Sequence, residues 1–322
     1  MVSDVDQITK IKIGTSGYSY PGSPPKGWYG VFYPETRGKK FDELEYYSQF
    51  FDAVEINTTF YRPPTPSMSK AWARKTPSGF EFSVKIWQKF THGRRIGDES
   101  GGGKDKWEAP AQADVDLFLK GIEPLLESGK LGVLLFQYPP GFHFTEENAE
   151  RLRWTLQAFK GHPKVVELRH RSWSDRLEET KALLLELGTS LVFIDEPKFG
   201  SSIRQEFKPV GTILYLRLHG RNRAKWWEHQ EAWERYDYLY SQEEIRPFVD
   251  KMREVLKEFP GSRAYVFFNN HARGQAVANA IMLNHEMGTP IKTHPAEALL
   301  KAFPQISGMV PKPAPLAQKS LF

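Results

Sequence analysis

The amino-acid sequence predicts a single (β/α)8 barrel of the TIM type, which is an α/β fold. Three observations lead to this prediction: eight short β-rich apolar runs recur along the chain, helical stretches separate them, and no internal linker divides them. Alternating strands and helices favour a parallel sheet, and eight such units are the number that closes a barrel. An open doubly wound sheet would need a glycine-rich phosphate loop after its first strand, and Gly14-Thr15-Ser16-Gly17 is too short for one.

The eight expected strands are short and rich in Val, Ile, Leu and Phe. They lie at Lys10–Thr15, Ala53–Thr58, Glu81–Trp87, Leu131–Tyr138, Val165–His170, Ser190–Asp195, Thr212–His219 and Arg263–Asn269. The expected helices lie at Lys40–Phe51, Ser67–Lys75, Asp114–Glu127, Thr145–Phe159, Ser174–Leu187, Gln242–Phe259 and Gln275–Met287. Ser241 and Glu244 form a capping box, and Thr145 precedes two glutamates that suit the positive end of a helix dipole.

The composition fits one globular domain. The 322 residues are 40% hydrophobic and 26% charged, which allows a sizeable core. The absence of cysteine excludes disulfides and thiolate metal sites and fits the cell interior. The first residues show no signal-peptide pattern, and no apolar run reaches membrane-spanning length, so we expect a cytoplasmic protein without a membrane partner. We expect the barrel to occupy residues 1–306 and a proline-rich, disordered tail to occupy residues 307–322.

Polar side chains recur on the strand faces that point into the barrel. Strand side chains alternate between faces, so outward Val54 and Ile56 leave Glu55 and Asn57 pointing inward. The same parity applied to the other strands gives inward Lys85, Gln137, Glu167, Arg169, Asp195, Arg217, His219 and Asn269. These residues lie at or near the C-terminal ends of their strands, where the active sites of barrels form.

Six of these side chains are charged, and they allow two interpretations. Three carboxylates and three cations balance, so a structural ion-pair network could fill the barrel. Burying an ion costs several kcal/mol before pairing, however, and apolar layers would fill a barrel as well. We therefore favour a functional pocket at this end of the barrel.

Several segments match one known family in order along nearly the whole chain. They are Ile13-Gly14-Thr15-Ser16-Gly17-Tyr18, Phe32-Tyr33-Pro34, Val54-Glu55-Ile56-Asn57-Thr58-Thr59-Phe60-Tyr61, Thr76-Pro77, Phe82-Ser83-Val84-Lys85, Thr91-His92, Phe136-Gln137-Tyr138-Pro139-Pro140, Glu167-Leu168-Arg169-His170, Ser172-Trp173, Arg217-Leu218-His219-Gly220 and Phe268-Asn269-Asn270. In these segments the sequence resembles the YecE-like family of unknown function. The resemblance implies a TIM-type barrel and supplies no established reaction. The barrel of this family is similar in outline to the barrels of apurinic-site endonucleases and sugar isomerases. Those enzymes bind divalent metals at the same face of the barrel.

A phosphate site is expected at the loops after the last two strands, where barrels often bind phosphate. These loops span 219–223 and 269–274 and carry glycines, asparagines and arginines that suit an anion. The alternative is that Asn269, Asn270 and Gly274 satisfy a tight turn. The expected substrate- or phosphate-binding residues are Asn57, Lys85, Arg169, Arg217, Asn269, Asn270, Tyr18 and Trp173.

The expected catalytic residues are Glu55, Glu167, Asp195 and His219, acting in acid–base chemistry or as metal ligands. A hydrogen-bonding, non-catalytic role for His219 is the alternative. A divalent metal is possible but not favoured, because no HxH or HExxH spacing is present and Arg169 and Arg217 would repel a cation. No other cofactor is indicated.

Aromatic residues follow the first and seventh strands. They are Tyr18, Tyr20, Trp28, Tyr29, Phe32 and Tyr33 after the first, and Trp226, Trp227, Trp233, Tyr236, Tyr238 and Tyr240 after the seventh. Rings beside Arg221, Arg223 and Lys225 suit stacking on bases or sugars. An amphipathic helix packed on the barrel explains the second group equally well.

The C-terminal residues Gln318, Leu321 and Phe322 resemble the short peptide with which bacterial replication and repair proteins bind the DNA sliding clamp. In that pattern the glutamine fills a polar pocket and the terminal Leu-Phe pair docks in a hydrophobic cleft. Lys319 departs from the usual hydrophobic second residue. The alternative is that Leu321 and Phe322 fold back onto the barrel.

Together these features give three functional hypotheses. The leading one is a nucleic-acid-binding or phosphodiester-processing barrel in DNA maintenance, which would bind a phosphodiester or an abasic sugar-phosphate. The second is a small-molecule enzyme that acts on a phosphorylated or acidic sugar in the same pocket. The third is a DNA-binding module without catalysis.

Overall fold

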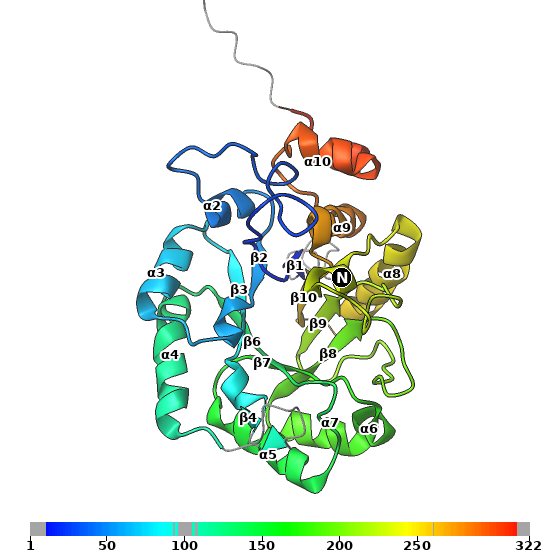
Figure 1. Ribbon diagram of the computed structural model, residues 1–322. Helices are drawn as coiled ribbons and strands as arrows, with labels where there is room; N and C mark the ends of the chain where they lie inside the picture. Colours follow the sequence, from blue (N-terminus) through cyan, green and yellow to red (C-terminus); the bar gives the residue numbers. More distant parts are fainter. Residues whose placement is uncertain (1–10, 93, 96–104, 107–108, 260, 314–322) are drawn as a thin grey trace, which may run out of the picture.

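Eight parallel strands form a nearly closed barrel in the computed structural model, which describes residues 11–92, 94–95, 105–106, 109–259 and 261–313 (Figure 1). The strands neighbour one another in the order β1-β10-β9-β8-β7-β6-β3-β2. Their bounds are β1 Ile11–Thr15, β2 Ala53–Ile56, β3 Glu81–Lys85, β6 Leu131–Gln137, β7 Lys164–Glu167, β8 Thr189–Asp195, β9 Ile213–Leu218 and β10 Arg263–Phe268. The predicted (β/α)8 fold is confirmed, and every strand overlaps the run that predicted it.

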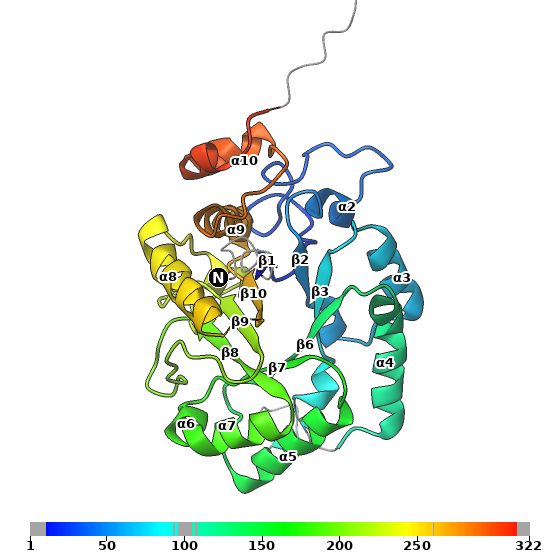
Figure 2. The ribbon, with the colours of Figure 1, turned by 180° about the vertical axis from the view of Figure 1, so that it is seen from behind.

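The helices surround the strands, as the view from behind also shows (Figure 2). They are α2 Glu43–Tyr47, α3 Pro66–Arg74, α4 Gln112–Glu127, α5 Glu146–Ala158, α6 Arg171–Asp175, α7 Leu177–Glu186, α8 Gln242–Glu258, α9 Gln275–Glu286 and α10 Glu297–Ala302. Short 3-10 turns are η1 Thr58–Phe60, η2 Gln88–Phe90, η3 Ala232–Tyr236, η4 Ala272–Gly274 and η5 Pro304–Met309, and β4 Arg94–Arg95 pairs antiparallel with β5 Asp105–Lys106.

Two helices differ from their predicted extents for local reasons. The predicted helix 40–51 shortens to α2 because the Asp42 side chain accepts hydrogen bonds from the backbone of Leu44 and Glu45, which fixes the helix start. The predicted helix 174–187 is divided into α6 and α7 at Arg176, whose backbone is not helical (φ −117°, ψ 52°). Helix α10 was not predicted.

The barrel closes where β1 meets β2, with little main-chain pairing. Gly17 N donates to Glu55 O (2.7 Å), and the Tyr47 hydroxyl of α2 lies between the strands. This hydroxyl accepts from Thr15 N (2.9 Å) and donates to Ala53 O (3.1 Å). A Cβ at Gly14 would lie 2.1 Å from Ala53 O, so this close approach requires glycine.

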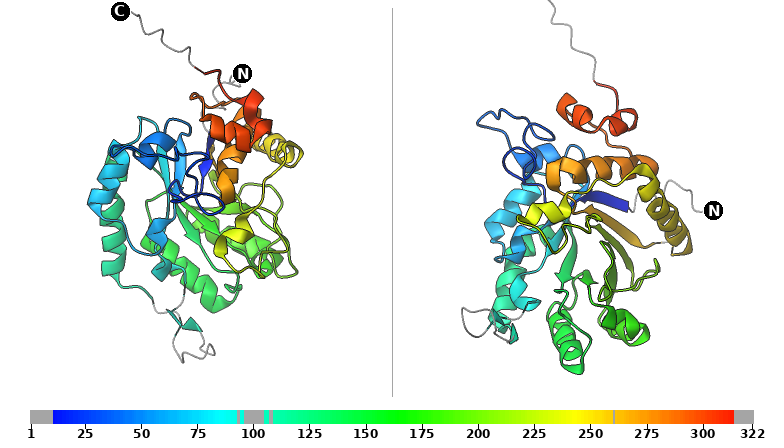
Figure 3. Two further views of the ribbon diagram at one scale, coloured as in Figure 1. Left: turned by 45° about the horizontal axis from the view of Figure 1, so that its top comes forward. Right: turned by 45° about the vertical axis from the view of Figure 1, so that its right-hand side comes forward.

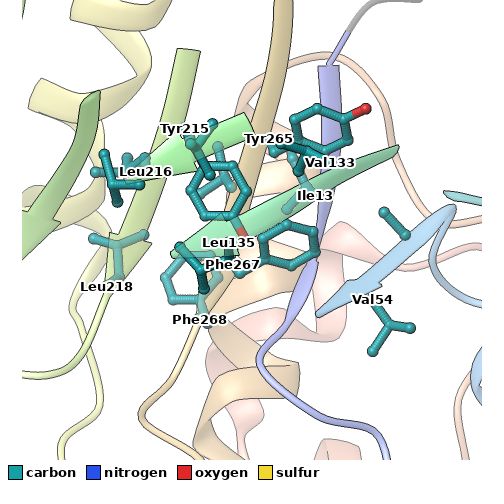
Figure 4. Packing of buried hydrophobic residues seen from close by; sticks show 14 of the residues in the cluster. Ile13, Val54, Val133, Leu135, Tyr215, Leu216, Leu218, Tyr265, Phe267 and Phe268 are labelled. Carbon is teal, nitrogen blue, oxygen red and sulfur yellow. The ribbon is translucent and has the colours of Figure 1, made fainter. Parts of the chain in front are cut away.

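Apolar and aromatic side chains fill the lower part of the barrel. Tyr215 and Phe267 lie side by side with ring centroids 5.4 Å apart, and Leu135 lies beside them (Figure 4). All three are buried. These side chains therefore pack the barrel below its C-terminal mouth, as is usual for this fold.

The C-terminal part of the described chain packs on the barrel. The η5 turn lies against α9, and α10 packs on η5 (Figure 3). Ile306 is buried, Val310 packs on the core, and His294 Nδ1 lies 2.7 Å from Pro311 O. The chain is thus held to the barrel as far as Pro311, beyond residue 307 where the sequence placed the start of the tail. Gln318, Leu321 and Phe322 lie outside the described residues. In the part of the chain that the structure covers, no helix is long and apolar enough to cross a membrane.

Candidate functional site

A pocket of about 360 Å³ opens at the C-terminal mouth of the barrel. Five of the predicted site residues line it: Asn57, Lys85, Arg169, Arg217 and Asn269. Each lies at or just beyond the C-terminal end of its strand, as the alternation of strand faces predicted. Ionised side chains from several strands therefore meet at one accessible cavity, which the sequence alone could only infer.

Arg217 on β9 is the centre of the pocket floor and is 1% exposed. Its Nε and Nη2 donate to the two carboxylate oxygens of Glu55 (2.9 and 2.7 Å). Its Nη1 donates to Gln137 Oε1 (2.9 Å) and to Glu167 Oε2. Burial opposes the charge, but Glu167 and Glu55 outweigh it and hold the Arg217 pKa above its ordinary value. The guanidinium is thus permanently charged and fixed in position.

Glu55 and Glu167 lie beneath Arg217 and are fully buried. The Tyr215 hydroxyl donates a further hydrogen bond to Glu55 (2.7 Å), and Arg169 Nε donates to Glu167 (2.6 Å). Burial alone would raise the Glu167 pKa, but the charges of Arg169 and Arg217 hold it well below its usual range. Both carboxylates are engaged by the protein and neither lines the pocket.

His219 is fully buried next to these carboxylates. Its Nδ1 lies 2.9 Å from Asn269 Nδ2, and its Nε2 lies 3.3 Å from Arg169 Nη2. Burial and the charge of Arg217 lower the His219 pKa to about 3. The imidazole is therefore neutral at physiological pH, and it supports the two residues above it that line the pocket, Arg169 and Asn269.

Glu196 is a buried carboxyl that sequence reasoning missed. Its Oε2 lies 3.7 Å from Arg169 Nη1, and no hydrogen bond reaches this atom from any residue the structure describes. Burial raises the Glu196 pKa. Glu196 follows β8 and was hidden from sequence reasoning because the strand parity assigned there was wrong.

The pocket is cationic overall. Its lining contains the side chains of Lys85, Arg169, Arg217 and Arg235, and no Asp or Glu occurs among the described residues that line it. Arg235 comes from η3; its Nη2 contacts His229 Nε2 (2.8 Å), and its Nε has no hydrogen-bond partner in the described chain. Such a site favours an anion, because the buried carboxyl groups of Glu55, Glu167 and Glu196 compensate only part of the charge.

Aromatic rings form the walls of the pocket. They are Tyr20, Phe60, Tyr61, Trp226, Trp227 and Tyr236. Tyr20 stacks on the His271 ring at 4.5 Å, and burial lowers the His271 pKa to about 4. Tyr61 and Trp227 are 72% and 57% exposed at the mouth. The sequence had identified Tyr20, Trp226, Trp227 and Tyr236 as rim aromatics without placing them in the pocket, and it gave no role to Phe60, Tyr61 or Arg235.

The structure corrects the position of Asp195. Register pairs Ile194 with Arg217 and Asp195 with Leu218, and residues paired across parallel strands face the same side of the sheet. Ile194 therefore points into the barrel and Asp195 points outward, opposite to the prediction. Asp195 accepts from Arg221 Nε (2.8 Å) and Nη2 (3.0 Å) and from the Tyr240 hydroxyl (2.7 Å), away from the pocket.

Three of the predicted substrate-binding residues also lie outside the pocket lining. Trp173 is a fully buried core residue whose Nε1 donates to Phe142 O (2.7 Å). Asn270 is fully buried and donates to Tyr238 O (2.7 Å) and Asn279 Oδ1 (2.8 Å), so it fixes a loop. Tyr18 lines a separate shallow depression near Asp42.

No metal site emerges from the side chains that the structure places. In the described ranges, no group of three or more His, Asp or Glu gathers in a way that could hold a metal ion. Glu55 and Glu167, which we expected as possible metal ligands, form ion pairs with Arg217. The ring of the nearby strand-end residue His170 stacks on His143 with centroids 3.8 Å apart.

Comparison with known proteins connects this geometry to one family. The family model described as protein of unknown function DUF72 matches residues 12–302. The UPF0759 protein YunF of Bacillus subtilis is 30% identical over 263 residues, which cover 77% of this chain and 87% of the relative. A DUF72 family protein from Thermotoga maritima has a similar structure (TM-score 0.70, 34% identity), with 85% of this chain and 97% of that chain covered.

A second solved structure supports the fold. It is a DUF72 family protein from Enterococcus faecalis (TM-score 0.71, 24% identity), with 89% of this chain and 99% of that chain covered. The YecE-like family that the sequence motifs resemble is the same family under another name. The chain belongs to the DUF72 (UPF0759) family, whose function is unknown.

Proposed function

We propose that the barrel mouth binds a small acidic ligand that carries a sugar or another flat ring, and that a phosphorylated or acidic sugar fits best. The observation that carries this proposal is the charge of the pocket lining, which has three arginines and a lysine. Arg169, Arg217 and Asn269 would hold the anionic group through donors that Glu167, Glu55 and His219 already orient. Charge-assisted hydrogen bonds of this kind are strong and directional.

The size of the pocket and the charges around it favour a small ligand. A volume of about 360 Å³ falls at the small end of the range for ligand pockets. Two cations beyond the mouth are paired with carboxylates: Lys225 with Glu234 (3.1 Å) and Arg273 with Asp237 (3.2 Å). These pairs reduce the free positive charge around the mouth, whereas a duplex would need positive charge spread along a face.

Calorimetric titration with inorganic phosphate, glucose 6-phosphate and glucose tests this proposal. We expect both phosphates to bind and glucose to bind far more weakly. Arg235→Gln should weaken phosphate binding by about tenfold, because it removes one pocket cation without uncovering a buried carboxylate. Arg74→Gln, which removes an exposed charge on α3, is the matched control and should bind like the wild type. Absence of phosphate binding by the wild type at low salt would reject the proposal.

A nucleic-acid ligand is the second candidate, favoured by the exposed rings of Tyr61 and Trp227 at the mouth. Bases stack on such rings, and the pocket would then take one phosphodiester or abasic sugar-phosphate unit. Binding of single- and double-stranded oligonucleotides should fall with added salt and fall further in Trp227→Ala. Hydrolysis assays with several divalent metals would separate a phosphodiester-processing enzyme from a binding module without catalysis. Oligonucleotide binding that Trp227→Ala leaves unchanged would count against this candidate.

Binding of the DNA sliding clamp through the C-terminal peptide is a separate proposal that rests on its sequence. Gln318, Leu321 and Phe322 would supply the contacts, as in the peptides they resemble. The full chain should bind a purified bacterial clamp in surface plasmon resonance, and a double change of Leu321 and Phe322 to alanine should abolish that binding. Equal binding by both proteins would reject this role for the peptide.

A further inference from the structure

We propose that Lys85 is a nucleophilic amine that forms a reversible imine with the carbonyl carbon of an acidic aldehyde or ketone bound in the pocket. This inference rests on the proposed function, because the cationic lining is what would hold the acidic group of such a compound. To the proposed function it adds the chemical class of the ligand, which is a carbonyl compound, and a covalent step at Lys85 Nζ.

The position of Lys85 carries the argument. Lys85 is the last residue of β3, and its side chain lines the pocket. Its Nζ makes no hydrogen bond and no ion pair with any residue in the described part of the chain, although Lys130 and Lys164 on other parts of the barrel donate to carbonyl oxygens. An amine that donates to no acceptor keeps its lone pair available for attack once it is neutral.

The structure holds this amine in place without a polar partner. The Thr59 hydroxyl donates to the Lys85 carbonyl oxygen (2.5 Å) and so fixes the end of β3 against η1. The next residue, Phe60, places its ring 4.1 Å from Lys85 Nζ. The ring packs beside the amine but accepts no strong hydrogen bond, so it positions Nζ in the cavity without binding its lone pair.

The surrounding charges make the neutral amine accessible at physiological pH. Burial and the nearby charge of Arg217 lower the Lys85 pKa to about 7, although Glu167 and Glu55 oppose the shift. Arg169 and Arg235 are the other charged side chains that line the pocket with Lys85 and Arg217, and its titratable residues also include His92, His271, Tyr20, Tyr61 and Tyr236. A lysine desolvated beside another cation is a known means of activating an amine for imine formation.

The step is balanced without an oxidant, a reductant or a cofactor. The Nζ lone pair attacks the carbonyl carbon, a C–N bond forms, and the C=O π electrons move to oxygen, which takes a proton. A proton from solvent then protonates the hydroxyl group of the resulting carbinolamine, the nitrogen lone pair expels it as water, and a protonated imine remains. The adjacent guanidinium groups of Arg169 and Arg217 would meanwhile hold the acidic group of the substrate.

Reductive trapping tests this inference. The full chain is incubated with glyceraldehyde 3-phosphate and sodium cyanoborohydride, and the adduct is located by peptide mass spectrometry. We expect Lys85 to be modified at least about tenfold faster than exposed Lys70 on α3, with a rate that rises through pH 7. Inorganic phosphate should slow this modification, and uncharged glyceraldehyde should react more slowly.

Two variants make the outcome unambiguous. Lys85→Arg keeps the positive charge but removes the nucleophilic amine, so phosphate binding should persist and fast labelling should disappear. Lys70→Arg should leave fast labelling unchanged. Labelling of exposed lysines without modification of Lys85 would overturn the proposal of an imine at Lys85. Phosphate binding by the same protein would still support the proposed function. If the wild type did not bind phosphate, the proposed function itself would be rejected.

Discussion

Two arginines on either side of the end of β9 make almost the same contacts in different surroundings. Arg217 forms a bidentate pair with Glu55 and reaches Glu167 with Nη1. Arg221 forms a bidentate pair with Asp195 and reaches Glu244 with Nη1 (3.1 Å). The first side chain is 2% exposed and the second 37%. The same chemistry therefore builds a pocket floor in one place and a loop anchor in the other.

The comparison shows that burial, and not the pairing itself, decides what such a cluster does. In the outer cluster, water solvates part of each charge, and Tyr238 and Tyr240 complete the hydrogen bonds of the two carboxylates. In the inner cluster, where water is excluded, Glu55 is compensated by Arg217 and Glu167 by Arg217 and Arg169. Breaking a buried pair leaves an uncompensated charge, whereas breaking an exposed one exposes groups that water can solvate.

The largest expected effect is that of Arg217→Met. It should lower the free energy of unfolding by roughly 3–5 kcal/mol, because Glu55 would remain buried without a cation and Glu167 would keep only Arg169. Urea unfolding followed by circular dichroism measures this change. A loss below about 1 kcal/mol would mean that the inner cluster contributes no more than an exposed pair.

Lys85→Met should raise the free energy of unfolding, whereas Arg217→Met should lower it. Because burial depresses the Lys85 pKa to about 7, the unfolded chain binds a proton more tightly than the folded chain between about pH 7 and 10.5. The wild type thus loses stability as pH falls through this window, and an uncharged methionine should raise the unfolding free energy by about 2 kcal/mol near pH 7. Thermal unfolding at pH 7 and pH 10 measures it. A destabilised variant at both values would contradict the expectation.

Arg221→Met should have a smaller effect, a loss of about 1 kcal/mol, since its partners are partly solvated. The same urea titration serves, and phosphate affinity should stay within twofold of the wild type because Arg221 is outside the pocket lining. A loss as large as that of Arg217→Met would abolish the distinction between the two clusters.

The smallest expected effect is a change in how the free energy of unfolding depends on pH in Glu167→Gln. Glu167 has a pKa below its ordinary value of 4.5, so it contributes stability above that pH, and this contribution is lost as pH falls below 4.5. Glu167→Gln should be less stable overall, and its stability should vary less with pH below 4.5, by about 0.5–1 kcal/mol per pH unit. Unfolding at intervals from pH 6 to pH 3 measures both slopes. Identical slopes of unfolding free energy against pH for the two proteins would show that Glu167 does not control the loss of stability in acid.

The strands and most inward side chains could be predicted from sequence because they follow from local alternation. Glu55 and Arg217 are polar residues flanked by apolar ones, and Asn269 continues the alternation of Val266 and Phe268, so the period of two assigns their faces. Strand β8 offers no such signal: Leu191, Val192, Phe193 and Ile194 are all apolar, and only register with β9 decides that Asp195 faces outward.

The pocket walls could not be predicted because they depend on the paths of loops. Trp226 and Tyr236 lie ten residues apart after β9, yet both line the cavity. Trp173 follows a polar strand end in the same way but turns into the core, where its indole donates to Phe142 O. Sequence places all three rings after strand ends and contains no local signal that separates them.

The Tyr47 hydroxyl inserted between β1 and β2 has a consequence for how the molecule opens. It replaces main-chain pairing at the one junction of the barrel where the strands form no continuous ladder. Amides here are expected to exchange with deuterium earlier than those of the ladders elsewhere, since fewer bonds protect them. Glu55 belongs to this junction through its carbonyl oxygen and to Arg217 through its carboxylate. Local parting of β1 from β2 would thus move Glu55 and, through it, Arg217 at the floor of the cavity.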